Sequence, residues 1–379
     1  MKKGWQTKPF EDCIESVKYT RKIQRKDFLD DGQFPIVSQE AEFTNGYWDD
    51  EADVFKVSTP VVIFGDHTQV LKYVDFDFVL GADGVKILPP RDFLRPKFFF
   101  YQLQAANFTS LGYARHYRLL KELEINYPPL AEQQRIVGLL DEAFEGLATA
   151  KANAERNLQN ARALFESHLQ SVFTHRGPGW VEKRLGELCE RITKGSSPKW
   201  QGISYVDAPG ILFVTSENVG EYDILLEQPK YVEEKFNAKD KKSILKNGDV
   251  LTNIVGASIG RTAVFDRDDV ANINQAVCLI RCEPHLLNNY YLAYLLNSPV
   301  FKQVLHDNEV NNARANLSLG FFSQLPVPMP PIPKQKEIVA KLDAFREETQ
   351  RLARLYERKH AALEALKKSL LHQAFTGQL

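Results

Sequence analysis

The chain has 379 residues, of which 48 are basic and 49 acidic, with a formal net charge of −1. This length exceeds what one hydrophobic core usually serves, so we expect two domains, and 44% hydrophobic with 26% charged residues excludes wholesale disorder. No apolar run reaches the roughly 18 residues that cross a bilayer, and the N-terminus lacks the apolar segment of a signal peptide. Four cysteines are too few for a disulfide framework in so long a chain. Together these features predict a cytoplasmic protein that does not enter a membrane.

Residues 1–129 are predicted to form a first globule of mixed α and β structure. The run at 61–64 is rich in β-branched and aromatic residues and predicts a strand. The stretch at 97–106 predicts a helix. We therefore expect an α+β domain here.

Residues 130–177 are predicted to form one long helix. Apolar or small residues recur every three or four positions, which is typical of a helix with a single packing face. This face comprises Ile136, Leu140, Ala143, Leu147, Ala150, Ala154, Leu158, Ala161, Phe165, His168 and Val172. The prolines at 128–129 suit a helix start and Gly177 suits its end. We expect His168 to pack on this face and not to act as a ligand.

Residues 178–329 are predicted to form a second α+β globule, and residues 330–379 a second long helix. Strands are predicted at 210–215, 249–255 and 276–280, and a helix at 287–297. Cys278 and Cys282 lie on an apolar run without further Cys or His at metal-binding spacing, so we expect buried thiols.

The two halves of the chain form a repeat, because 136–174 aligns with 338–376 without a gap and about a third of the 39 pairs are identical. A looser match joins GWQTKPFEDCIE, from Gly4, to GWVEKRLGELCE, from Gly179. Each repeat runs from globule to helix. Two such helices packed antiparallel would relate the globules by a pseudo-twofold axis, which suits a pseudo-twofold ligand such as duplex DNA.

The pattern PP-x3-Q-x2-IV-x2-LD opens both predicted long helices, at 128–141 and 330–343. The ending LLHQAFTG at 370–377, and GDVL followed by GASIG between 248 and 260, accompany it. With these motifs the chain resembles the specificity subunit of type I restriction–modification systems. The first globule departs from the pattern, since FGDHT at 64–68 stands where the second globule has its Gly-rich loop.

This resemblance implies a non-catalytic subunit with two target recognition domains of mixed α/β structure, separated by two long antiparallel helices. Each domain would read one half of a split sequence in double-stranded DNA, while the helices set the spacing. Two methyltransferase subunits would dock on the helices, and ATP-dependent restriction subunits would join them. S-adenosylmethionine, ATP and Mg are accordingly expected on partner subunits, with no cofactor or metal on this chain.

Predicted DNA contacts fall into four groups of residues. Phosphate contacts are expected from a basic stretch, comprising Lys18, Arg21, Lys22 and Arg25. A small, basic segment suits close approach to DNA and comprises Thr193, Lys194, Ser196, Ser197 and Lys199. Base contacts are expected after predicted strands, from Ser38, Gln39, Ser216 and Asn218. Shortly before the long helices stand the last candidates, Arg115, Arg314 and Asn316. Exposed charged turns and ordinary loop hydrogen bonding are the alternative interpretations.

Catalytic motifs are missing or incomplete. The sequence has no G-x4-G-K-[ST] phosphate loop, and Asn126-Tyr127-Pro128-Pro129 has the parts of an amino-methyltransferase motif in the wrong order. Two alternative functions stay open at this point. One is a stand-alone DNA methyltransferase or nuclease, and the other is a coiled-coil scaffold that binds only proteins.

The near-neutral charge is distributed over the whole chain. Residues 1–129 carry 17 basic and 19 acidic side chains, and residues 178–329 carry 16 and 18. The last segment, 330–379, has 10 basic and 6 acidic residues. Neither globule is therefore expected to bind polyanions in general, and DNA contact should come from local patches and from partner subunits.

Overall fold

The structure is a computed structural model that describes residues 4–81, 84–106, 108, 112, 114–310 and 317–379. The chain divides into two compact units. Unit 1 consists of Met1–Glu155 with Glu357–Leu379, and unit 2 is Arg156–Tyr356. Each unit thus contains one globule together with parts of both long helices.

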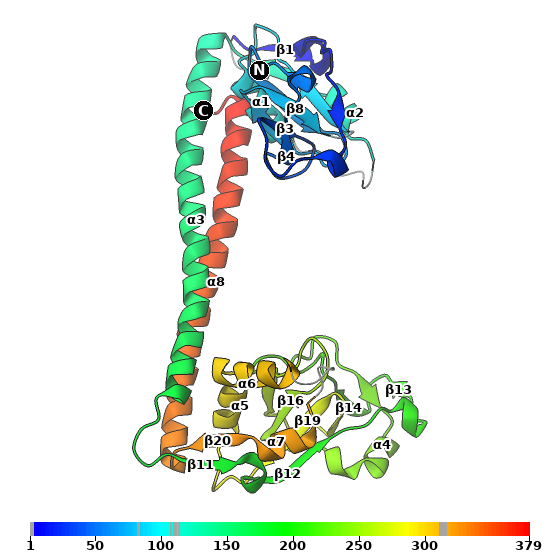
Figure 1. The fold of residues 1–379 in the computed structure, drawn as a ribbon, viewed down its shortest axis with the longest axis vertical. Coiled ribbons are helices and arrows are strands. Elements are labelled where there is room, and N and C mark those ends of the chain that lie inside the picture. Colours follow the sequence, from blue (N-terminus) through cyan, green and yellow to red (C-terminus); the bar gives the residue numbers. More distant parts are fainter. Residues whose placement is uncertain (1–3, 82–83, 107, 109–111, 113, 311–316) are drawn as a thin grey trace. The chain divides into compact units, whose positions relative to one another are not determined.

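Two helices of 45 residues dominate the helical structure, and both lie within the segments expected to be long helices (Figure 1). Such a helix is about 68 Å long. The helices are α1 (Pro96–Ala105), α2 (Tyr117–Lys121), α3 (Leu130–Thr174), α4 (Lys235–Lys239), α5 (Asn289–Asn297), α6 (Pro299–Val310), α7 (Leu319–Gln324) and α8 (Ile332–Thr376). The predictions of helices at 97–106 and 287–297 are confirmed by α1 and α5.

The globule of unit 1 contains three small sheets. One has the order β2 (Lys22–Ile23), β8 (Phe78–Gly81), β3 (Phe34–Val37) and β4 (Gly46–Trp48), with β5 (Val54–Phe55) also paired to β8. The next has the order β7 (Leu71–Val74), β6 (Val61–Gly65) and β9 (Val85–Leu88), and the last pairs β1 (Gln6–Pro9) with β10 (Glu124–Tyr127). Buried Val37, Ile63 and Leu80 belong to one hydrophobic cluster, so the first two sheets share a core.

The globule of unit 2 is also built from three sheets. One has the order β12 (Cys189–Lys194), β19 (Val277–Cys282), β16 (Asp249–Asn253) and β17 (Thr262–Phe265). The next has the order β13 (Tyr205–Val206), β15 (Tyr231–Val232), β14 (Ile211–Val214) and β18 (Ala271–Ile273), and the last pairs β11 (Val181–Arg184) with β20 (Pro326–Met329). The predicted strands of this globule are confirmed, and Cys278 and Cys282 are buried on β19 as expected.

One buried glutamine in each unit joins the globule to the start of a long helix. The Gln133 side chain donates to the carbonyls of Phe93 and Pro128, both at 2.8 Å, and accepts from the Arg95 N–H at 2.8 Å. Gln133 is fully buried. Three segments therefore meet at one amide group: the loop before α1, the Pro-Pro turn and α3.

Unit 2 repeats this arrangement at Gln335, which occupies the equivalent place in the repeat. Its amide donates to the carbonyls of Pro330 at 2.9 Å and Leu286 at 3.1 Å, and accepts from the Asn288 N–H at 2.8 Å. Gln335 is also fully buried. The glutamine of the repeated sequence pattern is thus a structural anchor in both units.

A tyrosine–aspartate hydrogen bond adds a further link between globule and long helix in each unit, about two helical turns after the glutamine. The Tyr101 hydroxyl donates to Asp141 at 2.5 Å, and the Tyr294 hydroxyl donates to Asp343 at 2.5 Å. Burial, and then the hydrogen bond to the carboxylate, raise the pKa of both tyrosines. Both hydroxyls therefore stay protonated donors across the ordinary pH range.

The long helices pair antiparallel inside each unit. In unit 1, Lys151 of α3 forms an ion pair of 2.7 Å with Glu364 of α8, and Lys367 lies over the ring of Phe144. In unit 2, the rings of Phe165 and Phe345 lie 6.3 Å apart. In unit 1 the first half of α3 thus contacts the second half of α8. In unit 2 the second half of α3 contacts the first half of α8.

The packing face of α3 follows the predicted series as far as Phe165 and then shifts by one residue. Leu169 is buried, whereas His168 is exposed, with its ring 4.8 Å from that of Phe345 in a T-shaped arrangement. The prediction of a packed His168 is therefore wrong. In this part of α3 the buried face packs on the globule of unit 2, since Leu169 and Phe173 belong to one hydrophobic cluster with Tyr291 of α5.

The glutamine anchors predict a specific loss of stability. We expect Gln133→Ala or Gln335→Ala to lower the free energy of unfolding by about 2–4 kcal/mol, because each leaves two carbonyls and one N–H without a partner in a buried place. Urea unfolding followed by circular dichroism measures this loss. The matched control is Gln134→Ala, an exposed glutamine on the same helix, which should change stability by less than about 0.5 kcal/mol.

Candidate nucleic-acid interface

Several strands of unit 2 end at one edge of the globule, and the predicted DNA contacts follow them. Lys194 at the end of β12 lies opposite Cys278, and Asn253 at the end of β16 lies opposite Val277, near the start of β19. The parallel strands β14 and β18 end together, at Val214 and Ile273. Backbone hydrogen bonds from Ile254 to Ala276 and from Asn274 to Val214 continue the pairing of each sheet into the segment 274–276, which connects β18 to β19. We call the loops 194–199, 215–219, 254–261 and 274–276 the loop edge of unit 2.

Asn253 holds two of these loops together. Its buried amide nitrogen donates to the carbonyls of Ser216 at 2.9 Å and Val219 at 3.3 Å, and to the Ser258 hydroxyl at 3.1 Å. Asn253 thus connects the loop after β14 to the Gly-rich loop after β16. Asn253 was not among the residues predicted to contact DNA.

The small, basic segment predicted at 193–199 divides into buried and exposed members. Thr193 is buried, whereas the side chains of Lys194 and Lys199 are exposed. Ser196 and Ser197 are half-buried, and the Ser196 hydroxyl donates to Asp240 at 2.5 Å. Only the two lysines are therefore free to approach a phosphate without rearrangement.

Gly195 explains why this segment needs a small residue. A Cβ at this position would lie 1.8 Å from the Ile273 carbonyl oxygen. The small residues of this segment were expected to suit close approach to DNA. At Gly195 the close approach is instead to the neighbouring strand β18, so the glycine serves internal packing.

The predicted base-reading residues after β14 have different environments. Asn218 is buried, accepts from the N–H and hydroxyl of Thr215, and donates to the Leu225 carbonyl. Ser216 is half-buried, and exposed Glu217 forms an ion pair of 2.5 Å with Lys230. The interpretation of Asn218 as a base reader is therefore not supported, because its side chain shapes the loop from inside.

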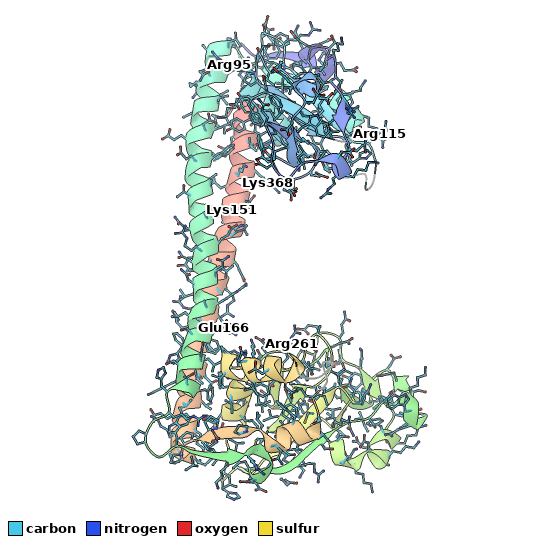
Figure 2. All side chains as sticks on the ribbon, in the orientation of Figure 1. Arg95, Arg115, Lys151, Glu166, Arg261 and Lys368 are labelled. Atoms are coloured by element: carbon cyan, nitrogen blue, oxygen red, sulfur yellow. The ribbon has the colours of Figure 1, made fainter. Side chains whose placement is uncertain are left out.

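Two exposed residues of unit 2 were not among the predicted contacts. Trp200 is 82% exposed and directly follows Lys199. Arg261 is exposed at the end of the Gly-rich loop, as Figure 2 shows. The sequence signal that could have identified Trp200 is an aromatic residue beside a lysine. For Arg261 the signal is an arginine directly after a Gly-x3-Gly loop. Arg314 and Asn316 lie outside the described residues, although the Leu317 N–H that follows them donates to the Ile254 carbonyl at the loop edge.

Unit 1 has a comparable edge, where β2, β3 and β8 end side by side in parallel. Ile23 lies opposite Gly81, and Val37 lies opposite Leu80. The turn after β6 follows at Gly65, which lies opposite Val85. We call the segments 24–27, 38–45 and 66–69 the loop edge of unit 1.

The basic stretch of unit 1 runs along β2 toward this edge, and two of its cations have acidic partners. Arg21 lies 3.6 Å from Asp53, and Arg25 lies 3.3 Å from Glu40. Lys18 is exposed, and Lys22 stands over the ring of Tyr19. The stretch is accessible, but its positive charge is partly neutralised, and its contact with phosphates stays a prediction.

Ser38 and Gln39 fasten the loop after β3. The buried Ser38 hydroxyl lies 2.8 Å from Asn45 Oδ1, and the Gln39 amide oxygen accepts from the His67 N–H at 3.2 Å. Lys72 is buried beneath the same loop and donates to the Glu42 carbonyl at 2.5 Å, and this burial lowers the pKa of its ammonium. Ser38 is therefore not available to read a base, and Gln39 is engaged inside the unit.

Arg115 is exposed beside an anchored segment of unit 1 (Figure 2). The next residue, His116, is buried, and its N–H donates to the Asp66 carbonyl at 2.7 Å. The Tyr117 N–H donates to the Asp66 carboxylate at 2.8 Å. Because Asp66 belongs to the turn after β6, Arg115 is held near the loop edge of unit 1.

In the part of the chain that the structure describes, no group of three or more His, Cys, Asp or Glu side chains could hold a metal ion. Likewise, none of the helices in these described ranges is both long and apolar enough to cross a membrane.

The role of Asn253 gives a test of the loop edge. We expect Asn253→Ala to lower the free energy of unfolding of unit 2 by about 1–3 kcal/mol, because the carbonyls of Ser216 and Val219 lose their buried donor. Hydrogen exchange should quicken in both loops that this side chain joins. Asn247→Ala is the control, since Asn247 is exposed and bonds to exposed Asp268. Unchanged exchange in the 215–219 loop would contradict the role given to Asn253.

Comparison with known proteins gives consistent results along the whole chain. A model of the type I restriction modification DNA specificity domain matches residues 2–156 and 178–357. The Type I restriction enzyme EcoBI specificity subunit of Escherichia coli is 24% identical over 376 residues, covering 86% of this chain and 78% of the relative.

Solved structures share the fold. A chain from a study of complex assembly and conformational transition of the type I R-M system has a TM-score of 0.75 at 21% identity, covering 100% of this chain and 99% of that one. The HsdS subunit from Thermoanaerobacter tengcongensis has a TM-score of 0.58 at 22% identity, covering 100% and 98%. With its two matched segments, the chain belongs to the family of the type I restriction modification DNA specificity domain.

Proposed function

We propose that the chain is the DNA specificity subunit of a type I restriction–modification complex, in which each unit reads one half of a bipartite DNA sequence. One observation carries this proposal: the family domain occurs twice, and each copy presents a loop edge on a globule anchored by the same buried glutamine. A specificity subunit leaves methyl transfer and DNA cleavage to other subunits. Two recognition domains on one chain suit a target with two separate specified segments.

The exposed cations of each loop edge support phosphate contacts that fix the register on DNA. In unit 2 these are Lys194, Lys199 and Arg261, and in unit 1 they are Arg25 and Lys26, with exposed Arg115 held nearby. Base reading then falls to polar groups and backbone atoms of the anchored loops, since several predicted readers are buried. Phosphate contacts position a protein without specifying sequence, whereas base contacts specify.

The partners and cofactors follow from the same proposal. Two methyltransferase subunits would dock along the paired helices, and restriction subunits would join that complex. S-adenosylmethionine, ATP and Mg would be bound by these partners and not by this chain. The near-neutral net charge supports this division, because a recognition subunit can share the phosphate contacts with its partners.

Exchange of one recognition domain tests the modular function. Replacing residues 178–329 by the second domain of another family member should change one half of the recognised sequence and leave the other half as it was. Mapping methylated adenines in cells that produce the complex measures this. Replacement of residues 1–129 is the reciprocal control and should change the other half. A change in both halves, or in neither, would show that the domains do not read independently.

Removal of two loop-edge cations tests the phosphate contacts. Lys194→Ala with Lys199→Ala should weaken binding of the complex to all DNA sequences alike and reduce the slope of log affinity against log salt by about 1–2, because up to two phosphates lose their partners. The control is Lys246→Ala, an exposed lysine just before the opposite end of β16. An unaltered salt slope would place these lysines away from the DNA.

A further inference from the structure

In unit 2 the long helix α8 contacts the loop that follows β14. This loop, residues 216–225, begins at the loop edge, and Tyr222 and Asp223 within it contact the helix. The Arg346 guanidinium of α8 forms an ion pair with the Asp223 carboxylate and lies 4.7 Å from the centroid of the Tyr222 ring. A cation over an aromatic face is attracted by the ring's quadrupole, so two adjacent loop residues are bound by one helix side chain.

Tyr222 adopts a backbone conformation that needs support from its neighbours. Its φ of 73° lies in the left-handed region, which bulky residues rarely occupy. The Tyr222 N–H donates to the Thr262 carbonyl at 2.8 Å, and its ring packs 5.2 Å from that of Tyr294 and 6.0 Å from that of Phe165. The Arg346 contact completes this set, so its loss should release the strained turn.

Hydrogen bonds within the loop connect Tyr222 and Asp223 at the helix to residues 216–218 at the loop edge. Asn218 and Leu225 exchange two hydrogen bonds, of 2.8 and 2.9 Å, which close the loop on itself. Gly220 and Asp223 are joined by a further backbone bond of 3.0 Å. A shift at Tyr222 and Asp223 therefore moves Ser216 and its neighbours as well.

There is room for such a shift. A cavity of about 320 Å³ lies beside this contact and is lined by Tyr222, Asp223, Tyr294 and Arg346, among others. The loop can move into this space without first displacing packed core residues.

The first unit has a different residue at the equivalent place. Phe144 stands where unit 2 has Arg346, and it packs against Tyr101 while Lys367 lies over its ring. These contacts lie among the helices and not at a loop after β3. The two units can therefore be tested against each other within one molecule.

We infer that Arg346 is a positioning residue for sequence recognition by unit 2: from α8 it holds Tyr222 and Asp223, and so sets the place of residues 216–218 on the DNA. The inference rests on the proposed function, since it takes this loop to face DNA. Arg346, although it lies on a long helix, should therefore affect recognition of one half-site only.

The test uses the full chain in complex with its modification subunits and measures affinity for the target and for targets with one changed base pair in either half. A single mismatch normally weakens specific binding by roughly 5- to 150-fold. For changed base pairs in the half read by unit 2, we expect Arg346→Ala to lower the ratio of target affinity to mismatch affinity about tenfold. The ratio for the other half should stay unchanged. Arg346→Lys, which keeps a cation beside Asp223, should restore most of the lost discrimination. Arg354→Ala is the control, since Arg354 is exposed on the same helix and its loss changes the charge equally.

Two results would overturn the inference: full discrimination by a folded Arg346→Ala variant, or an equal loss in both halves, which would indicate general destabilisation. Should Arg346→Ala not fold, Asp223→Asn removes the ion pair from the exposed loop side and must show the same one-sided loss. A wild-type complex that discriminates in neither half would instead refute the proposed function, so the two failures are distinguishable.

Discussion

A fully buried glutamine amide at the start of each long helix is the interaction on which both units depend. The side-chain amides of Gln133 and Gln335 donate and accept hydrogen bonds, and so join a loop, a Pro-Pro turn and a helix. The backbone groups that they bind are shielded from water and need a partner within the protein. The Tyr101–Asp141 and Tyr294–Asp343 hydrogen bonds then fix the short helix of each globule to the long helix farther along. Inside each unit, the strands that carry the loop edge consequently stand in a defined place on the helix. A recognition domain needs this, because a loop can read base edges only if its scaffold holds it still.

Much of this fold could be predicted from the sequence, because its signals are local or repeated. The spacing of apolar residues predicted both 45-residue helices, and the ungapped match between 136–174 and 338–376 predicted a tandem arrangement. The strands around 61–64, 210–215, 249–255 and 276–280 were recognisable from β-branched and aromatic residues. His168 was misplaced because the spacing of apolar residues within one helix does not show that the last turns of α3 bury Leu169 and Phe173 against the globule of unit 2.

The candidate site was predictable only as segments and not as side chains. Ser38 and Asn218 were chosen for their polar groups after predicted strands, and Thr193 as part of a small, basic segment, yet the structure buries all three. Whether a polar side chain at a strand end turns outward or caps its own loop depends on how that loop folds back, as it does to bring Asn45 to Ser38. Asn253 and Arg346 act through partners that are distant in sequence, Ser216 and Asp223, and no local pattern distinguishes them from other polar residues.

Independent reading of two separate DNA segments by the two units of this chain can be tested directly. The most direct measurement is the map of methylated adenines in a genome where this chain works with its modification subunits. Two units held on paired helices should give one asymmetric motif, with two specified segments separated by an unspecified gap of constant length. A single continuous motif, or a gap that varies from site to site, would contradict this expectation.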